Sequence, residues 1–544
     1  MSAFSATSAA SAALNFPTGL GWQGDPGSLA FEDAAIRQVL SDLDHPVWAV
    51  SLGGRLGVTC SGSLVSDAGV GALAAFTPAI SAASLGDPAF RAAYNTRYAC
   101  YAGSMANAIS SAGLVIALGQ HGLLGSYGAG GMSPARIEEA IRQVQAALPN
   151  GPYAFNLINS PNELAMEQRT AALYLQHGVR TIEASAYLAL TSALVWYRAA
   201  GLELAPDGQI QMNNRVIAKV SRKEVSKRFL EPAPADILAQ LVSEGKITQQ
   251  QANLAALVPM ADDITMEADS GGHTDNRPLV GILPAIIAQR DEIQAKYNYP
   301  RLVRIGAGGG IATPASALAA FMMGAAYVVT GSINQSCVES GASLHTRTLL
   351  SQAEMTDVAM APAGDMFEMG VKVQVLKRGT LFAMRAQKLY DLYSRYESWE
   401  DVPQKEREKL EGTVLKRPFG EIWDECVKFF SERDPRQVER GNANTKDKMA
   451  LVFRWYLGLS SRWSNIGEKG REMDYQIWCG PAMGSFNDWV RGTYMADPAN
   501  RHIADVALHI LTGSAYLQRL RLLAAQGVHF SPAVDRYQPE KPLA

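Results

Sequence analysis

Two glycine-containing segments near the middle of the 544-residue chain have the residue types of a phosphate-binding site. The first, Gly308 to Gly310, follows an apolar run and precedes Thr313-Pro314, which has the pattern of a helix N-cap with proline at the first helical position. A helix N-terminus presents free backbone N–H groups and the positive end of the helix dipole, and both stabilise an anion. The second segment, Gly331-Ser332, follows the next apolar run and adds an N–H group and a hydroxyl. Together the segments predict one phosphate site at the ends of two adjacent strands.

A histidine stands close to this pattern. His273 follows Glu267, Asp269 and Gly271-Gly272, directly after another apolar run. An imidazole has a pKa suited to proton transfer near neutral pH, so His273 is the candidate catalytic residue. Two alternatives remain open: a histidine that only makes structural hydrogen bonds, and a divalent metal site that also uses the carboxylate of Asp275. We disfavour the metal site, because the phosphate-containing ligand expected here does not need a metal ion.

The elements that must position these residues follow from the alternation of short apolar runs with helical ones, which is typical of parallel β/α units. The helices between the runs have recognisable ends: Ser160-Pro161-Asn162-Glu163 has the pattern of a capping box, while His121 and His177, each followed by glycine, are expected at helix C-termini. We predict strands at 99–103, 123–127, 153–158, 181–184, 216–220, 263–267, 302–305 and 327–330.

This number of strands, with helices between them, predicts an α/β fold of the (β/α)8 TIM barrel type. In such barrels the ligand lies at the C-terminal ends of the strands, and phosphate is bound after the seventh and eighth strands. The two glycine segments follow those two strands. A Rossmann fold would instead place its glycine-rich turn after the first strand of the unit, so we disfavour it.

Three further positions suit a flat heteroaromatic ligand. The first strand is followed by "YAGSMANA", small residues against whose backbone a ring can lie, with Met105 among them. The third strand contains Asn156, whose amide can donate and accept hydrogen bonds, and the fifth carries the cation of Lys219. With a phosphate in the glycine cradle and a ring across the top of the barrel, this set suits flavin mononucleotide (FMN).

The rest of the chain divides by composition. We predict a disordered tail at 1–15, a small N-terminal α/β unit at 16–95 with a strand at 47–52, the FMN-binding barrel at 96–390, and a helical C-terminal domain at 391–544. A helical insert at 223–261, with Thr248 as a cap of its second helix, is expected above the site as a lid or subdomain. An alternating strand is expected at 371–376.

The bulk composition excludes several classes of protein. The formal net charge of −3 gives no reason to expect binding to nucleic acid or to an anionic membrane surface. Two long stretches lack charged residues, one between Arg97 and Arg136 and one between Arg304 and Glu339, but glycines and polar residues interrupt both, which argues against membrane spans. The five cysteines form no C-x-x-C pair, so we expect neither zinc nor disulfides and assign the chain to the reducing cytoplasm.

Several longer motifs show a family resemblance. "EADSGGHTDNRP", "AKVSRKEVS", "VVTGSINQ", "APAGDMFEMGVKVQVLKRGT" and "DYQIWCGPAMGSFN" together resemble the PfaD-type trans-acting enoyl reductases of polyunsaturated fatty acid and polyketide synthases. These belong to the superfamily of nitronate monooxygenases and FMN-dependent enoyl reductases. The resemblance covers nearly the whole chain after the first fifteen residues, and the motifs beyond the barrel are specific to the PfaD-type branch.

The resemblance implies a flavin barrel that reduces the 2,3 double bond of an enoyl thioester on acyl carrier protein, with NADPH or NADH as the hydride donor. His273 would be the catalytic residue, supplying a proton directly or through a water that it holds. Ala312 stands where the family usually has glycine, which matters only if that position needs a positive φ. The cofactor-binding residues would be Met105, Asn156, Lys219, Gly271, Gly272, Gly308, Gly309, Gly310, Gly331 and Ser332.

The same resemblance implies acyl carrier protein and other synthase subunits as partners, and a possible homodimer. Because carrier proteins are acidic, a candidate docking surface is formed by Lys377, Arg378, Arg385 and Lys388, which could equally be an ordinary solvated helix and turn. Three alternative functions stay open: a nitronate monooxygenase, a non-catalytic flavin-fold subunit of a synthase, and a phosphosugar isomerase or aldolase on the same barrel.

Overall fold

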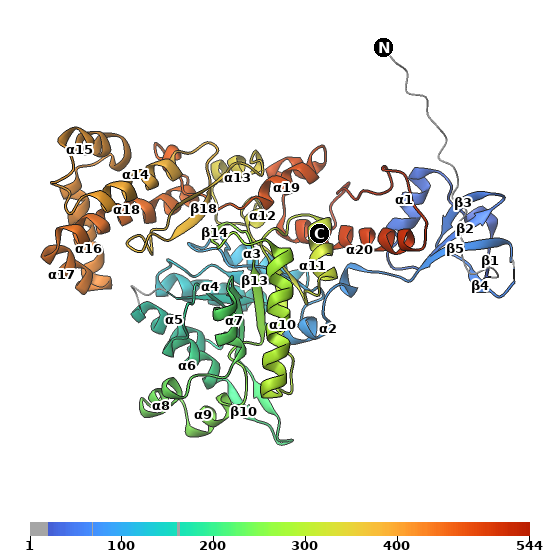
Figure 1. Cartoon of the computed structure of the whole chain (residues 1–544), viewed down its shortest axis with the longest axis horizontal. Helices are drawn as coiled ribbons and strands as arrows, with labels where there is room; N and C mark the ends of the chain where they lie inside the picture. Colours follow the sequence, from blue (N-terminus) through green and yellow to red (C-terminus); the bar gives the residue numbers. More distant parts are fainter. Residues whose placement is uncertain (1–19, 68, 160–163) are drawn as a thin grey trace, which may run out of the picture. The chain divides into compact units, whose positions relative to one another are not determined.

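The computed structural model describes residues 20–67, 69–159 and 164–544, which form two compact units (Figure 1). One unit contains the described residues up to Leu85 together with Leu511–Gln538, and the other contains Gly86–Ile510 and Pro539–Ala544. This division differs from the predicted boundaries at both ends of the chain. The predicted tail, residues 1–15, lies outside the described residues.

The larger unit is built on a closed parallel barrel, as the alternating apolar runs predict. Its strands are hydrogen-bonded in the order β12-β13-β15-β16-β6-β7-β8-β9, which closes the sheet on itself. The strands are β6 (Cys100–Ala102), β7 (Leu124–Tyr127), β8 (Ala154–Ile158), β9 (Thr181–Ser185), β12 (Arg215–Val220), β13 (Asp263–Glu267), β15 (Arg304–Gly308) and β16 (Val328–Thr330).

Helices alternate with these strands and surround the barrel (Figure 1). Most of the predicted helix ends are confirmed. Thr313 caps α11 in a capping box, and His121 and His177 each follow the last residue of a helix. The predicted capping box at 160–163 lies outside the described residues. The helices are α3 (Ala112–Gln120), α4 (Pro134–Ala147), α5 (Leu164–Gln176), α6 (Ser192–Ala200), α7 (Lys223–Leu230), α10 (Leu279–Tyr297), α11 (Pro314–Met322) and α12 (Ser332–Gln335).

One strand boundary differs from the prediction in a way that bears on the site. Strand β15 continues through Gly306 to Gly308, residues that the sequence assigns to the loop. A Cβ atom on Gly306 would lie 2.2 Å from the ring of Tyr327, so glycine is needed at this point of the strand. The glycine run therefore first accommodates a buried aromatic ring and only then, at Gly309, leaves the barrel.

The N-terminal end of the barrel is closed by α2 (Pro88–Tyr94), which the sequence boundaries wrongly assign to the N-terminal unit. The Phe90 ring stacks on Tyr327 with centroids 4.3 Å apart. The hydroxyl of Tyr94 donates a hydrogen bond to Asp263 at the start of β13. These buried contacts tie α2 to the barrel core rather than to the residues that precede it.

The helical insert does not form a lid. Its helices α8 (Ala235–Ser243) and α9 (Gln249–Ala255) pack against α6 and the small hairpin of β10 (Leu202–Leu204) and β11 (Ile210–Met212), as Figure 1 shows. The reason is topological. Helix α7, the first helix of the predicted insert, returns the chain from the C-terminal to the N-terminal end of the strands, and α8 and α9 follow it there.

A substitution in the insert tests this placement. Thr248 caps α9, with its hydroxyl accepting from the N–H of Gln251 at 3.1 Å. Thr248→Ala is expected to destabilise the protein by about 0.5–2 kcal/mol in urea unfolding, the usual range for a lost N-cap. Steady-state kinetics should give an unchanged KM, because the insert is remote from the site. Thr248→Ser is the matched control, and a KM raised by Thr248→Ala alone would indicate a lid after all.

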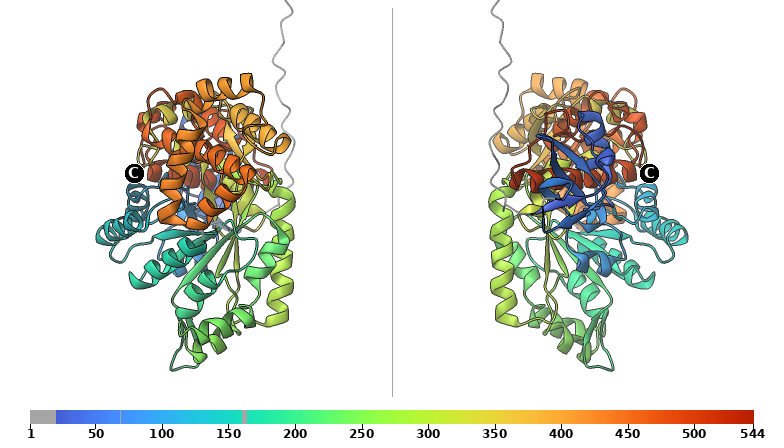
Figure 2. Two further views of the ribbon diagram at one scale, coloured as in Figure 1. Left: turned by 90° about the vertical axis from the view of Figure 1, so that its left-hand side faces the viewer. Right: turned by 90° about the vertical axis from the view of Figure 1, so that its right-hand side faces the viewer.

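The C-terminal end of the barrel is covered by an additional sheet and a helical layer. The sheet has the order β14-β18-β17, with strands at Gly272–His273, Lys372–Leu376 and Val358–Pro362, which confirms the strand expected at 371–376. Figures 1 and 2 show the helical layer at the end of the barrel opposite α8 and α9. Its helices are α13 (Leu344–Ser351), α14 (Phe382–Arg395), α15 (Gln404–Leu410), α16 (Phe419–Arg433), α17 (Pro435–Ala443), α18 (Thr445–Ile466) and α19 (Ala482–Val490).

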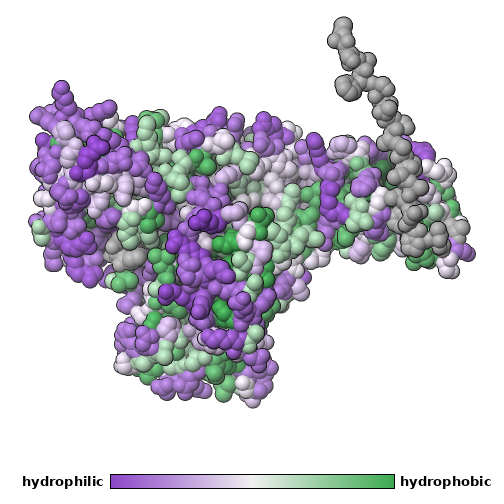
Figure 3. Space-filling model, in the orientation of Figure 1, coloured by the Kyte–Doolittle hydropathy of each residue, from purple (hydrophilic) through white to green (hydrophobic). Residues whose placement is uncertain are grey.

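The outer and the buried sides of these helices differ in polarity. Hydrophilic side chains dominate the visible outer surface of α15, α16 and α17 (Figure 3). The buried side contains large apolar side chains, with the rings of Trp399 and Phe419 stacked 4.7 Å apart. None of the helices in the described ranges is long and apolar enough to cross a membrane.

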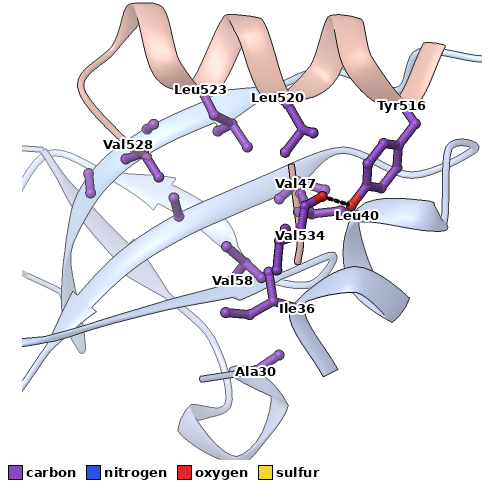
Figure 4. Packing of buried hydrophobic residues seen from close by; sticks show 13 residues of the cluster. Ala30, Ile36, Leu40, Val47, Val58, Tyr516, Leu520, Leu523, Val528 and Val534 are labelled. Carbon is purple, nitrogen blue, oxygen red and sulfur yellow. Dashed lines mark hydrogen bonds between the residues drawn. The ribbon is translucent and has the colours of Figure 1, made fainter. Parts of the chain in front are cut away.

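The smaller unit is an antiparallel sheet with two helices on one face. The sheet order is β3-β2-β5-β1-β4. Leu40 of α1 and Leu520 and Leu523 of α20 pack against Val47 and Val58, and the Tyr516 hydroxyl donates to the carbonyl of Val534 (Figure 4). The elements are β1 (Gly21–Gln23), α1 (Asp33–Ser41), β2 (Val47–Leu52), β3 (Arg55–Thr59), β4 (Ser63–Val65), β5 (Gly71–Thr77) and α20 (Ile503–Ala525), of which the part from Leu511 on belongs here.

Candidate functional site

A cavity of about 670 Å³ lies at the C-terminal ends of the barrel strands, between the strand ends and helices α16 and α18. A volume of this size suits a cofactor or substrate site. All the residues that sequence analysis selects for the site line this one cavity, from Met105 after β6 to Ser332 after β16. The structure therefore brings the predicted residues together, while their individual roles stay predictions.

The ends of β15 and β16 form the predicted anion cradle. Gly309 has φ of +80°, and a Cβ atom there would lie 2.7 Å from the backbone of Ala268. Next to it, Gly310 and Gly331 have no described atom within 4 Å of the position that a Cβ atom would take, so the space beside their Cα atoms is open. Glycine is thus required for close backbone packing on one side of the loop and leaves room for a ligand on the other.

The loop after Gly310 has normal geometry despite its departure from the family pattern. Ala312 is buried and does not have a positive φ. Its N–H donates to the hydroxyl of Ser316, which also closes the capping box with Thr313. A methyl group is therefore accommodated at this position without backbone strain.

A segment from the far end of the chain completes the cradle. The N–H of Gly480 donates to the Ser332 hydroxyl at 3.0 Å. A Cβ atom on Gly271 would lie 2.8 Å from the backbone of Cys479, and one on Gly480 would lie 2.9 Å from the backbone nitrogen of Gly271. The glycines of two distant motifs thus allow two backbones to touch, and the contact fixes both the histidine loop and the Ser332 hydroxyl.

A charged cluster lies at the floor of the cavity. Lys219 Nζ is 3.6 Å from a carboxylate oxygen of Glu183 and 3.6 Å from one of Glu267. Glu183 is fully buried and also accepts hydrogen bonds from the backbone and hydroxyl of Ser104. Burial acts to lower the pKa of Lys219, but the two carboxylates outweigh it and raise that pKa. The positive charge of Lys219 is therefore stabilised by two carboxylates within the barrel.

Asn156 has fewer hydrogen-bonding atoms available to a ligand than its sequence position indicates. Its amide nitrogen donates to the carbonyl of Glu183 at 3.0 Å and to the hydroxyl of Ser185 at 2.8 Å. Both amide hydrogens are thus used by the described part of the chain. The amide oxygen is the atom of Asn156 that can accept a hydrogen bond from a ligand.

His273 is paired with a carboxylate. Its Nε2 lies 3.2 Å from Oδ1 of Asp365, and both side chains are partly exposed to the cavity, by 38% and 40%. Burial acts against both charged forms, yet their mutual hydrogen bond and attraction outweigh it: the pKa of His273 is raised and the pKa of Asp365 is lowered. The pair thus favours a protonated imidazole beside an ionised carboxylate.

The loop that carries His273 is held on several sides. Gln374 of β18 donates to Asp269 at 2.8 Å, and Asn276 donates to the same carboxylate at 2.9 Å. Asp275 accepts from Arg222 at 2.8 and 2.9 Å. Each acidic residue of the metal alternative is thus bound by protein donors. Among the described residues, no group of three or more His, Cys, Asp or Glu side chains is placed to hold a metal ion.

Sequence reasoning misses several residues of the site. Asp365 belongs to "APAGDMFEMG", which carries the family resemblance but follows no barrel strand, so the strand-end rule does not select it. Glu183 lies within β9 and has no signal beyond its position in an apolar run. The one sequence signal for Gly480 is the presence of glycine in the late aromatic motif.

The predicted basic docking surface is not supported by the side-chain contacts. Arg385 pairs with buried Asp474, Lys388 with Glu406 at 2.7 Å, and Arg378 with Asp357 at 3.1 Å. Three of its four cations are therefore neutralised within the protein. The sequence cannot show this, because the partner carboxylates lie elsewhere in the chain.

Comparison with protein families divides the chain into three matched segments. A model of nitronate monooxygenase matches residues 88–387. A model of the N-terminal domain of fatty acid synthase subunit PfaD matches residues 22–79. A model of the inserted helical domain of [acyl-carrier-protein] S-malonyltransferase matches residues 396–475, which include α16 and α18.

Individual proteins are similar over most of the chain. One subunit of the polyunsaturated fatty acid synthase of Thraustochytrium sp. is 49% identical over 446 residues, 81% of this chain and 30% of that protein. Polyketide biosynthesis protein PksE of Bacillus subtilis is 43% identical over 444 residues, 81% of this chain and 58% of that protein. The chain thus spans about a third to just over half of these relatives.

One solved structure is similar in both sequence and fold. The enoyl reductase domain of MlnA, from the macrolactin biosynthesis cluster of Bacillus amyloliquefaciens, is 39% identical, with a TM-score of 0.77. The match covers 81% of this chain and 99% of that domain. The similarity therefore extends over more of the chain than the barrel alone.

Proposed function

The chain belongs to the nitronate monooxygenase family and carries a PfaD N-terminal domain, and on this basis we propose that it is an FMN-dependent enoyl reductase. Its substrate would be a 2-enoyl thioester on acyl carrier protein, reduced with NADPH or NADH. The observation that carries the proposal is the match over 99% of an enoyl reductase domain. The cavity, with its predicted anion cradle and the His273–Asp365 pair, provides the chemical support.

The residues of the cavity fit FMN. Open space lies beside the Cα atoms of Gly310 and Gly331 at the ends of β15 and β16, and their N–H groups would hold the phosphate, with the Ser332 hydroxyl as a further donor. The Asn156 oxygen, the Lys219 cation and the backbone near Met105 would surround the ring. When bound, the flavin supplies the hydride chemistry between NAD(P)H and the carbon-carbon double bond.

His273 would supply the proton that the reduction requires. Saturating an enoyl thioester adds a hydride to the β-carbon and a proton to the α-carbon. The raised pKa of His273 keeps a larger fraction of the imidazole protonated near neutral pH than its ordinary value of about 6.5 would allow. His273 is therefore the group of the cavity that we assign as the proton donor.

The helical layer would bind the acyl chain and its carrier. Phe429, Phe430 and Trp455 from α16 and α18 line the cavity on the side of the helical layer, where an apolar chain would gain free energy by leaving water. The segment that contains them resembles a helical domain named for an acyl-carrier-protein transferase. Relatives that are synthase subunits further support other synthase subunits as partners.

An anaerobic absorbance experiment tests the function. The purified protein, loaded with FMN, should lose its flavin bands on addition of NADPH and regain them when a 2-enoyl thioester on acyl carrier protein is added, with the saturated thioester as product. The same acyl chain on a small thiol should react with a higher KM. A protein that cannot be loaded with FMN would overturn the flavin assignment.

Nitronate monooxygenase is the second candidate, because the family model itself bears that name. The two activities separate in one assay. A flavin-loaded protein that leaves the enoyl thioester unreacted but oxidises an alkyl nitronate in air would reverse our preference. A protein active on neither would support the non-catalytic subunit.

A further inference from the structure

The partner of His273 comes from outside the barrel. Asp365 lies in the turn between β17 and β18, whereas His273 belongs to the loop after β13. The two side chains meet because β14 pairs with β18, so that His273 is placed opposite Val373. The contact joins Nε2 of the imidazole to Oδ1 of the carboxylate, at 3.2 Å.

The turn that carries Asp365 is itself fixed by the helical layer. The Nε of Arg454, on α18, donates to the carbonyl of Gly364 at 3.1 Å. The same guanidinium donates to Glu368 at 3.1 Å, which holds it between two points of the turn. The N–H of Ala363 donates to the carbonyl of Val371 at 2.8 Å and closes the turn. Asp365 is thus placed by backbone contacts, not only by its attraction to the imidazole.

We propose that Asp365 is a positioning residue that orients the His273 imidazole, so that Nδ1 is the nitrogen that exchanges a proton with the substrate. The proposal rests on the proposed function and extends it. With Nε2–H donating to Asp365, the imidazolium gives the Nδ1 proton to the α-carbon and remains as the neutral Nε2–H tautomer. Solvent then returns a proton to Nδ1. Asp365 stays ionised throughout.

The charged groups around the pair determine the direction of its pH dependence. Asp365 and Glu267 favour the imidazolium, whereas Lys219 opposes it. Arg454 favours the ionised form of Asp365. Removing the charge of Asp365 therefore leaves Glu267 as the carboxylate that still favours a protonated His273, with Lys219 acting against it.

The primary experiment measures His273 directly and needs no turnover. Nuclear magnetic resonance titration of the full-length protein, with labelled imidazole rings, follows its eight histidines, and the His273→Gln variant identifies the signal of His273. In Asp365→Asn the pKa of His273 should fall by about one unit, tenfold in the protonation constant, and the fraction of the Nε2–H tautomer should decrease. An unchanged pKa and tautomer would overturn the proposal.

Kinetics then connects the pair to the reaction. The alkaline limb of the kcat profile, where the protonated donor is lost, should move to lower pH in Asp365→Asn with KM little changed. Asp365→Glu should restore the limb, since a carboxylate returns to the same turn. Asp391→Asn, which removes an exposed carboxylate on α14, is the matched control and should shift nothing.

The two readouts separate failure of the proposal from failure of the function. A shifted His273 signal in a protein without reductase activity would support the pairing and reject the enoyl reductase. A shifted signal combined with an unmoved kcat profile would show that Asp365 orients the ring without affecting proton delivery, and would overturn the catalytic part of the proposal. A circular dichroism spectrum equal to that of the parent would confirm that Asp365→Asn is folded.

Discussion

The His273→Ala variant is expected to bind flavin like the parent protein and to reduce the enoyl thioester about 10²- to 10⁴-fold more slowly, the usual contribution of a positioned proton donor. The loss should appear in kcat, because the imidazole acts on the developing product rather than on binding. His273 is partly exposed on a short strand, so its removal leaves no buried cavity. Stopped-flow absorbance with saturating substrate measures the effect.

Two comparisons make this result specific to proton transfer. The rate at which NADPH bleaches the flavin should be nearly the same in His273→Ala and in the parent, because that step needs no proton donor to carbon. His273→Gln keeps a hydrogen-bonding side chain next to Asp365 but cannot deliver a proton at neutral pH, and it should be equally slow. Turnover within threefold of the parent in either variant would assign the proton to another group or to bulk water.

Gly309→Ala should weaken FMN binding by about 100-fold or more. An alanine at φ +80° costs roughly 1–2 kcal/mol, and its Cβ, 2.7 Å from the Ala268 backbone, adds a clash of about 1–3 kcal/mol that only a shift of the loop can relieve. Such a shift moves the N–H of Gly310 away from the phosphate. Quenching of FMN fluorescence on titration with apoprotein measures the affinity.

A substitution at a second glycine distinguishes the effect of backbone strain from the effect of a steric clash. Gly178, after α5, has φ of +64° and no described atom within 4 Å of its Cβ position, so Gly178→Ala introduces similar backbone strain without a clash. This variant should lose some stability and keep its FMN affinity. If Gly309→Ala bound FMN as tightly as Gly178→Ala, the cradle would not lie at the end of β15.

The barrel could be predicted from sequence because its signals are local. Each strand is a short apolar run, and each helix carries its own caps, as Thr313 and His121 illustrate. The errors arose where tertiary contacts decide. Helix α2 joins the barrel through the stacking of Phe90 on Tyr327, and the insert lies away from the site because α7 reverses the direction of the chain. Neither fact is visible in composition or periodicity.

The residues of the candidate site could likewise be predicted only in part. A barrel brings the ends of all its strands together, so residues as distant as Met105 and Ser332 could be assigned to one cavity from their strand positions alone. Asp365 stands 92 residues after His273 and outside the barrel, so no rule about strand ends selects it. Finding it requires the pairing of β14 with β18, a contact between a two-residue strand and a later one.

The close approach of Gly271 to Cys479 and Gly480 has a consequence for inheritance. A gene fusion or duplication that carried only the barrel would remove two contacts. The histidine loop would lose its packing against the backbone of Cys479, and the Ser332 hydroxyl would lose the hydrogen bond from Gly480. A segment that carries the site intact must therefore extend from the barrel at least as far as Gly480. Within it, a change at position 271 or 480 can be accepted only if the facing backbone changes as well, so the two motifs are expected to evolve together.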